Sequence, residues 1–127
     1  MRISELAARA QITPDTIRFY EKMGLLDETH FTRLANNYRD YNESACTRLE
    51  LIRHGQAAGF RLSEMAGGLR RWETDEITLE QKENYFMQRL EQVDAQIAKL
   101  YEMRTYIEDK LAMIREHREQ EGEYFPV

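Results

Sequence analysis

Four side chains between residues 13 and 22 carry groups that bind anions. Thr13 and Thr16 supply hydroxyls, and Arg18 and Lys22 supply cations, in a chain whose formal net charge is -5. The stretch predicts a short helix on which Arg18 lies about 100° round the axis from the apolar residue before it, and so faces outward. Free N–H groups at a helix start also attract anions. We therefore expect an anion-binding helix here.

Further cations and hydroxyls follow this helix. Between Leu26 and Asn42 the helical spacing is lost, and the Asn36-Asn37 pair is typical of a hairpin turn, because asparagine tolerates left-handed dihedrals. Such a hairpin presents donors suited to phosphates, and the next two helices add a basic edge. The side chains concerned are Arg33, Tyr38, Arg39 and Tyr41 in the hairpin, then Arg53, Arg61, Arg70 and Arg71.

Each of these residues also has an ordinary structural interpretation. Arg18 alone is equally well explained as a surface arginine, Tyr38 and Tyr41 as aromatic core residues, and Arg70 and Arg71 as a solvated helix face. Their combination favours an anionic polymer over a small substrate. An enzyme is the weakest interpretation, because no Ser/His/Asp set, paired carboxylates or glycine-rich phosphate loop stands out.

The single cysteine, Cys46, excludes an internal disulfide framework and a multi-cysteine metal site within one chain. His30, His54 and His117 are scattered without an i, i+4 pair, so no metal and no other cofactor is predicted. Cys46 falls near a predicted helix N-terminus, which favours a thiolate. The alternative, which we prefer, is that it packs as a small hydrophobe.

The elements that position these groups follow from periodicity and caps. ISELAARA predicts a first helix with Ser4 as N-cap. The second helix has Thr13 as N-cap, Pro14 at the first helical position and Gly24 as its stop. Two helices joined by so few residues predict a helix-turn-helix, and the hairpin after them predicts a winged form.

Two more helices complete the front of the chain. One is predicted between Asn42 as N-cap and Gly59 as stop, and a further short helix starts near Ser63. The pair Gly67-Gly68 inside this last helix is unfavourable by roughly 1 kcal/mol for each glycine relative to alanine. This helix therefore needs support from packing.

From Leu79 to about Arg118 apolar residues recur in alternating steps of three and four, with breaks at Glu83 and Arg104. A helix of this length spans roughly 60 Å. Its single apolar stripe needs a partner helix, and since no other long helix is predicted, the partner is a second copy of the chain. The stripe consists of Leu79, Phe86, Leu90, Val93, Ile97, Leu100, Ile107, Leu111 and Ile114.

The chain is thus mainly α, with a winged helix-turn-helix head and a long dimerising helix. We expect a head at 1–72, a hinge at 73–78, a coiled-coil helix at 79–118 and a tail at 119–127. Through Trp72 there are eleven Lys or Arg against nine Asp or Glu, and after it seven against fourteen, so the positive charge sits in the head. No apolar run reaches the roughly 20 residues that cross a bilayer, and a cytoplasmic protein is expected.

Three motifs occur in one order along the chain: TIRFYEKMGLL, then NYRDY, then RLELIRHGQAAGFRLSEM. Together they resemble the MerR family of transcriptional regulators, from about Ile3 to Leu69. The resemblance implies a homodimer with antiparallel long helices that binds a palindromic operator in a long-spacer promoter. It also implies that the dimer bends and untwists this DNA for RNA polymerase, which is indirect readout.

Site residues carry over from the family by position. Arg18 and Tyr20, and in the wing Tyr38, Arg39 and Tyr41, are expected at the DNA backbone, and Asp15 and Thr16 at the bases. The chain departs from the pattern at Gln11, where a turn glycine is common, and at Phe19, which replaces a tyrosine. The glycine pair is a third departure.

The effector is left open. Metal-sensing members use cysteines near the start of the long helix, and this chain has none there, so a thiolate metal sensor is not expected. Some members sense electrophiles through a lone cysteine, which makes Cys46 a candidate sensor. A small organic molecule is another option, although the aromatic residues that could line a pocket more simply pack the dimer and hinge. These residues are Trp72, Tyr85, Phe86, Tyr101 and Tyr106.

Two other functions fit the same motifs. The first is an effector-independent repressor or architectural DNA-bending protein. The second is a coiled-coil interaction protein whose head does not bind DNA, and this one predicts no salt-dependent affinity for duplexes.

Overall fold

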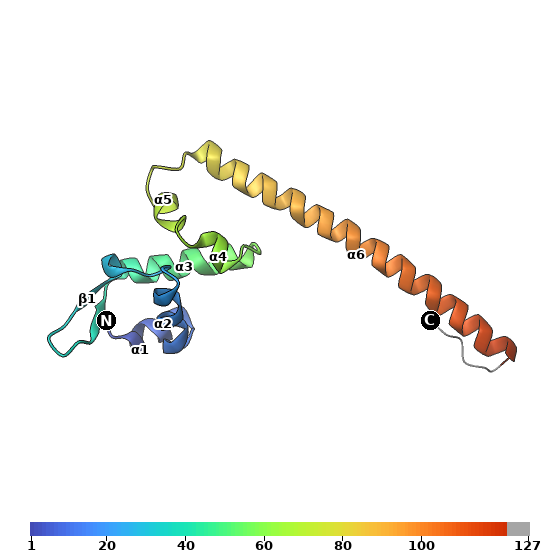
Figure 1. The fold of residues 1–127 in the computed structure, drawn as a ribbon, viewed down its shortest axis with the longest axis horizontal. Coiled ribbons are helices and arrows are strands. Elements are labelled where there is room, and N and C mark those ends of the chain that lie inside the picture. The colour runs from blue at the N-terminus through green and yellow to red at the C-terminus, as the bar shows by residue number, and fades with distance from the viewer. Residues whose placement is uncertain (122–127) are drawn as a thin grey trace. The chain divides into compact units, whose positions relative to one another are not determined.

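The computed structural model describes residues 1–121, and the chain divides into two compact units (Figure 1). The first unit, Met1–Thr78, holds five α-helices, a 3-10 helix and a two-stranded sheet. The second begins at Leu79. Within the described part of the chain, the elements of the first unit are α1 (Ile3–Ala10), α2 (Pro14–Lys22), η1 (Glu28–His30), β1 (Phe31–Arg33), β2 (Arg39–Tyr41), α3 (Glu43–Ala57), α4 (Leu62–Met65) and α5 (Leu69–Glu73).

The helix-turn-helix is formed by α1 and α2. The Thr13 hydroxyl accepts a hydrogen bond from the Thr16 amide, Pro14 is the first residue of α2, and Gly24 has a φ of +80°, all as predicted. Gln11 adopts the left-handed conformation, with a φ of 57°, where a glycine is usual. A glutamine therefore forms the turn, at the steric cost of a side chain in that region.

The predicted start of the first helix is wrong. Ser4 is not the N-cap, because α1 begins at Ile3 with Arg2 in extended conformation before it. The reason is tertiary: the Met1 carbonyl accepts a 2.7 Å hydrogen bond from the Tyr41 amide, so the chain runs alongside β2 and turns into the helix at once.

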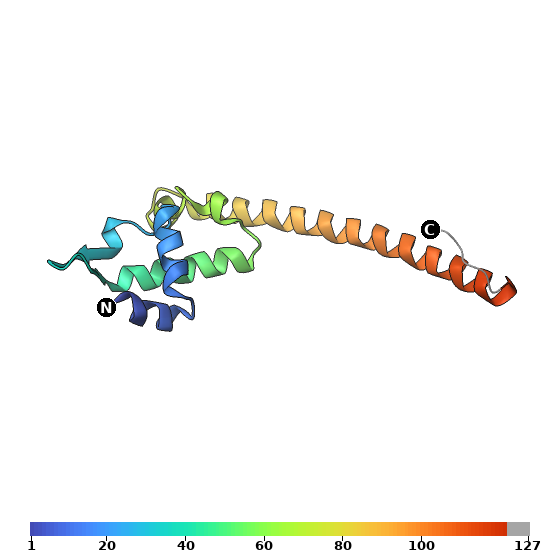
Figure 2. The ribbon, with the colours of Figure 1, turned by 60° about the horizontal axis from the view of Figure 1, so that its bottom comes forward.

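The hairpin is the predicted wing. Strands β1 and β2 are antiparallel, with Phe31 opposite Tyr41 and Arg33 opposite Arg39. The turn falls at the asparagine pair as predicted, and of the two residues Asn37 takes the left-handed conformation, with a φ of 66°. Figures 1 and 2 show the tip of the hairpin projecting beyond the helices of its unit.

The helix predicted to start near Ser63 is wrong as a single element. It is split into α4 and α5, because Gly67 has a φ of +82° and breaks the helix between them. Helix α4 packs closely on α3: a Cβ on Gly55 would overlap the Met65 sulfur. The glycine pair therefore makes a corner, which a continuous helix cannot form.

The core of the first unit lies between its helices and the base of the wing. Leu6, Ile17, Leu25, Leu26 and Ile52 are fully buried. The rest of the cluster comes from every element except η1 and β1, and comprises Ala7, Tyr20, Tyr41, Ala45, Leu49, Met65 and Leu69. The front of the chain thus has its own hydrophobic core.

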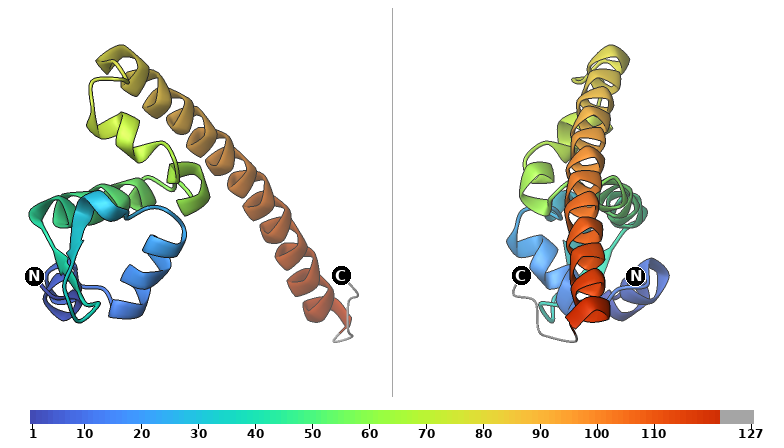
Figure 3. Two further views of the ribbon diagram at one scale, coloured as in Figure 1. Left: turned by 60° about the vertical axis from the view of Figure 1, so that its left-hand side comes forward. Right: turned by 90° about the vertical axis from the view of Figure 1, so that its right-hand side faces the viewer.

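The described residues of the second unit form one continuous helix, α6 (Leu79–Glu121), of 43 residues (Figure 3). It extends past the expected end, so residues 119–121 of the predicted tail are helical, and 122–127 lie outside the described residues. Six large side chains of the predicted stripe are 41–61% exposed: Phe86, Leu90, Ile97, Leu100, Ile107 and Leu111. Among the described residues, no helix is apolar enough over a sufficient length to cross a membrane.

Candidate nucleic-acid interface

The N-terminal half of α2 carries exposed polar groups. The hydroxyls of Thr13 and Thr16 lie 2.9 Å apart, and Arg18 Nη1 lies 2.9 Å from Asp15 Oδ1. Arg18 is 59% exposed and Asp15 is 94% exposed, so this ion pair is open to competition from another anion. Lys22 is exposed one turn further on. The groups expected to bind anions are thus accessible.

The wing presents a second set of exposed groups. Tyr38 is 68% exposed at its tip. Arg33 is exposed as well, with Nη1 at 3.4 Å from Asn37 Oδ1. Arg39 is one-third exposed and stacks on Phe31, with its guanidinium carbon 4.8 Å from the ring centroid. This stacking leaves the guanidinium oriented by the wing itself.

Tyr41 does not belong to the exposed surface of the hairpin, and its expected position there is wrong. It is 2% exposed and its hydroxyl donates to Glu21 Oε1. Burial, followed by this hydrogen bond, raises the pKa of the Tyr41 phenol. The cause is strand alternation: Arg39 and Tyr41 share the face directed at the helices, whereas Tyr38 lies on the other.

Tyr20 is also buried, which confirms that it packs inward with Ile17. Its expected contact with DNA stays a prediction that this burial does not favour. Arg53 and Arg61 are exposed, on α3 and at the start of α4, outside the contacts that join α2 to the wing. Arg70 and Arg71 are likewise exposed on α5, and Arg71 pairs with Glu76 at 3.6 Å.

Cys46 lines a cavity of about 330 Å³ together with Arg9, Gln11, Glu50 and Arg53. Its side chain is half-buried against the core cluster, as the packing interpretation expects. Burial raises the pKa of the thiol, although Arg9 opposes the shift. The thiol form therefore dominates at neutral pH, and this disfavours a reactive thiolate.

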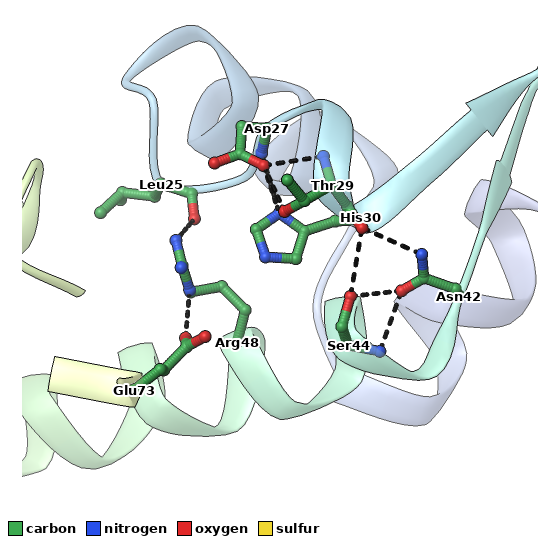
Figure 4. A network of polar contacts seen from close by, with 8 residues as sticks. All are labelled: Leu25, Asp27, Thr29, His30, Asn42, Ser44, Arg48 and Glu73. Carbon is green, nitrogen blue, oxygen red and sulfur yellow. Dashed lines mark hydrogen bonds and ion pairs between the residues drawn. The ribbon is translucent and has the colours of Figure 1, made fainter. Parts of the chain in front are cut away.

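Two buried polar residues, Arg48 and His30, were not predicted from the sequence and are shown in Figure 4. Arg48 on α3 is 5% exposed, donates from Nη1 to the Leu25 carbonyl at 2.8 Å, and donates from Nε to Glu73. The available signal was its position three residues after Ala45, on the apolar side of α3. Arg48 thus ties α5 and the end of the helix-turn-helix to α3.

His30 is the second missed residue. It is 2% exposed, and its Nδ1 accepts a 2.9 Å hydrogen bond from the Asp27 amide. Burial lowers the pKa of His30, and the charge of Arg48 lowers it further. At pH 7 the imidazole of the folded head is therefore neutral, and because Nδ1 accepts a hydrogen bond, the proton lies on Nε2.

This neutral histidine predicts a pH dependence of stability. The His30 pKa is lower in the folded state than the unfolded value of about 6.5, so the unfolded chain binds more protons below that pH. The free energy of unfolding should then fall as the pH drops from 7 toward 5. In His30→Asn, whose amide oxygen can accept from Asp27, this slope should flatten. Urea titrations at several pH values measure it, with exposed His54→Asn as the control, and an unchanged slope in the His30 variant would contradict the assignment.

Comparison with known proteins identifies the fold and its class. Residues 1–72 match the family described as "MerR HTH family regulatory protein", and residues 46–110 match the one described as "MerR, DNA binding". The HTH-type transcriptional regulator ZntR of Escherichia coli (strain K12) is 37% identical over 108 residues, which are 84% of this chain and 75% of ZntR.

Solved structures of MerR-type regulators have the same fold as this chain. The transcription regulator PbrR691 from Ralstonia metallidurans CH34, crystallised with lead(II), is 30% identical, with a TM-score of 0.68 over 91% of this chain and 86% of that one. HiNmlR, a MerR family regulator lacking the sensor domain and bound to promoter DNA, has a TM-score of 0.59 over 94% and 93% of the two chains; at 23% identity this shows the fold alone. The predicted mainly helical, winged helix-turn-helix architecture with a long C-terminal helix is confirmed.

The match over residues 1–72 includes all three motifs and the whole surface formed by α2 and the wing. The chain belongs to the MerR family of helix-turn-helix regulatory proteins, and it is a DNA-binding regulator of transcription and not an enzyme.

Proposed function

We propose that two copies of the chain pair along α6 and bind the two halves of a palindromic operator with their heads. The observation that carries this proposal is the pairing of two features in one chain. One is a set of exposed cations and hydroxyls on α2 and the wing. The other is an apolar stripe on α6 that a single chain leaves exposed.

In each head, α2 enters the major groove and the wing lies along the neighbouring backbone. Arg18, Lys22, Arg33, Tyr38 and Arg39 bind phosphates, and the start of α2 reaches the bases. Thr13, Asp15 and Thr16 supply the polar groups there. Arg53 and Arg61 extend the phosphate contacts from α3 and α4.

The dimer acts on a promoter with a long spacer between its recognition elements. Bending and untwisting this DNA costs roughly 1–6 kcal/mol by smooth elastic estimates, which the contacts of two heads must offset. The deformation brings both elements into position for RNA polymerase. We place the protein in the cytoplasm, where it meets promoter DNA and polymerase.

Three modes of control are compatible with this head. An organic effector or an electrophile can shift the dimer between two DNA-bound states, or the protein acts without an effector as a repressor or architectural protein. Among the described residues, no three His, Cys, Asp or Glu side chains are grouped so as to hold a metal ion. In-vitro transcription with the purified dimer, alone, with candidate organic effectors and with candidate electrophiles, separates these modes.

Arg18→Ala tests the proposed phosphate contacts. The substitution removes one phosphate-binding cation from each protomer, so the slope of log Kd against log salt should fall by about two, because each neutralised phosphate contributes about 0.9 to the slope. Fluorescence titrations of a short operator duplex, selected from random sequences by the wild-type protein, measure the slope. Arg115→Ala, which replaces an exposed arginine on α6, is the control and should leave it unchanged.

Two outcomes would contradict the proposal. If Arg18→Ala keeps the wild-type slope of log Kd against log salt, Arg18 does not contact a phosphate and the proposed role of α2 is wrong. A wild-type protein without salt-dependent affinity for any duplex would instead favour the coiled-coil interaction protein.

A further inference from the structure

Glu21 on α2 contacts two residues of the wing strand β2 at once. Its Oε1 accepts the hydroxyl proton of Tyr41, and its Oε2 lies 3.4 Å from Arg39 Nε. Arg39 is held from a second side by Phe31 of β1. One carboxylate therefore joins the helix proposed to enter the major groove to the strand that carries a proposed phosphate contact.

Burial distinguishes this contact from the surface ion pairs of the head. The side chain of Glu21 is 14% exposed, whereas Asp15, which pairs with Arg18, is 94% exposed. Arg39 Nε is buried and makes no hydrogen bond of good geometry among the described residues, so the carboxylate beside it supplies its compensation. The two terminal amino groups of the guanidinium are the donors left for a phosphate.

Placing a carboxylate here works against DNA binding in electrostatic terms. A negative charge beside a phosphate-binding surface lowers the affinity for every duplex, whatever its sequence. If the charge of Glu21 only opposed DNA binding, its burial between α2 and β2 would be unexplained. Its geometric effect is different, because it fixes the distance between α2 and β2, and that distance decides whether groove and backbone contacts form together.

We propose that Glu21 is a positioning residue for operator recognition, which acts by holding Arg39 and the wing at a fixed place relative to α2. This inference rests on the proposed function of Arg39 as a phosphate contact. It predicts opposite effects on two kinds of DNA. Neutralising Glu21 weakens binding to the operator, where both contacts must fit, and strengthens binding to unrelated duplexes, where only charge matters.

Glu21→Gln is the central variant, because its amide oxygen still accepts the Tyr41 hydroxyl proton and so preserves the core contact. We expect operator affinity to fall about tenfold, within the range of couplings seen between contacting residues. Affinity for an unrelated duplex of the same length should rise. Glu28→Gln, which neutralises an exposed acid on η1, is the matched control and should change both affinities in the same direction.

A double-mutant cycle with Arg39→Ala shows whether Glu21 acts through Arg39. In the Arg39→Ala background, Glu21→Gln should cause no further loss of operator affinity. Additive losses, or equal losses on both duplexes, would overturn the inference and indicate a purely structural role. Melting temperatures of all variants identify losses of affinity that are caused by unfolding. If Glu21→Gln fails to fold, Tyr41→Phe provides a second variant, because it removes the other contact of Glu21. Tyr41→Phe should weaken binding to the operator but not to the unrelated duplex.

The phosphate contact of Arg39 and the positioning role of Glu21 can fail separately. If Arg39→Ala leaves operator affinity unchanged, Arg39 does not bind DNA, and both the proposed contact and the role of Glu21 are wrong. If Arg39→Ala weakens binding but Glu21→Gln does not, only the positioning role of Glu21 is wrong.

Discussion

Replacing Leu100 with glutamate is expected to convert the protein to monomers and to remove tight operator binding. Leu100 lies in the middle of α6 and is 61% exposed in the single chain. Full burial of a leucine is worth roughly 1.5–3 kcal/mol, and each dimer loses two. The new carboxylates must also be buried between the two apolar stripes of the dimer, which is unfavourable for unpaired charges.

Loss of the dimer should affect DNA binding more than any single substitution in the head does. Two linked heads bind as a bivalent unit, and linkage of this kind raises affinity by about 10²–10⁴. A monomer keeps the contacts of one head and loses this factor. Sedimentation velocity at micromolar concentration measures the oligomeric state, and operator titration under the same conditions measures the loss.

Ala95→Glu is the matched control for this experiment. It adds the same charge to the same helix at an exposed position on the side opposite the apolar stripe. This variant should remain dimeric and bind the operator normally. A dimeric Leu100→Glu protein, or a monomer with wild-type operator affinity, would show that the stripe on α6 does not hold two functional heads together.

Local rules were sufficient for much of the fold. Thr13, Pro14 and Gly24 determine the bounds of α2 through hydrogen bonds and dihedrals that involve near neighbours only. Asn37 determines the turn of the wing in the same way. The spacing of apolar residues was sufficient for most of α6, because a heptad pattern repeats from Leu79 to Ile114 with breaks only at Glu83 and Arg104.

The failures share a dependence on distant parts of the chain. The start of α1 depends on the pairing of Met1 with Tyr41, which are 40 residues apart. The inward face of the wing is the one whose side chains, Arg39 and Tyr41, contact Glu21 on α2. The sequence of a three-residue strand does not show which of its two faces is covered. Arg48 and Glu73 are separated by 25 residues. The motifs identify a family, but pairings of this kind appear only once the helices are packed.

The largest effect on the stability of the head is expected from Arg48→Ala. Arg48 is 5% exposed, and its removal leaves the Leu25 carbonyl without its donor, Glu73 without its partner and a cavity beside α3. Breaking a buried pair by removing one member costs about 3–5 kcal/mol, and we expect the lower end because Glu73 is 31% exposed. Thermal and urea unfolding at a fixed protomer concentration measure the loss, since dimerisation also contributes to the transition.

Burial, not the ion pair as such, should account for this effect. Arg9 also pairs with a glutamate, Glu43, at 2.8 Å, but both side chains are more than half exposed, so Arg9→Ala should change stability little. The double variant Arg48→Met, Glu73→Leu replaces the pair with apolar groups and should recover part of the loss, leaving mainly the Leu25 carbonyl unsatisfied. Equal effects of Arg48→Ala and Arg9→Ala would contradict this account. In that case the tie between α3, α5 and the end of the helix-turn-helix contributes no more than a surface contact.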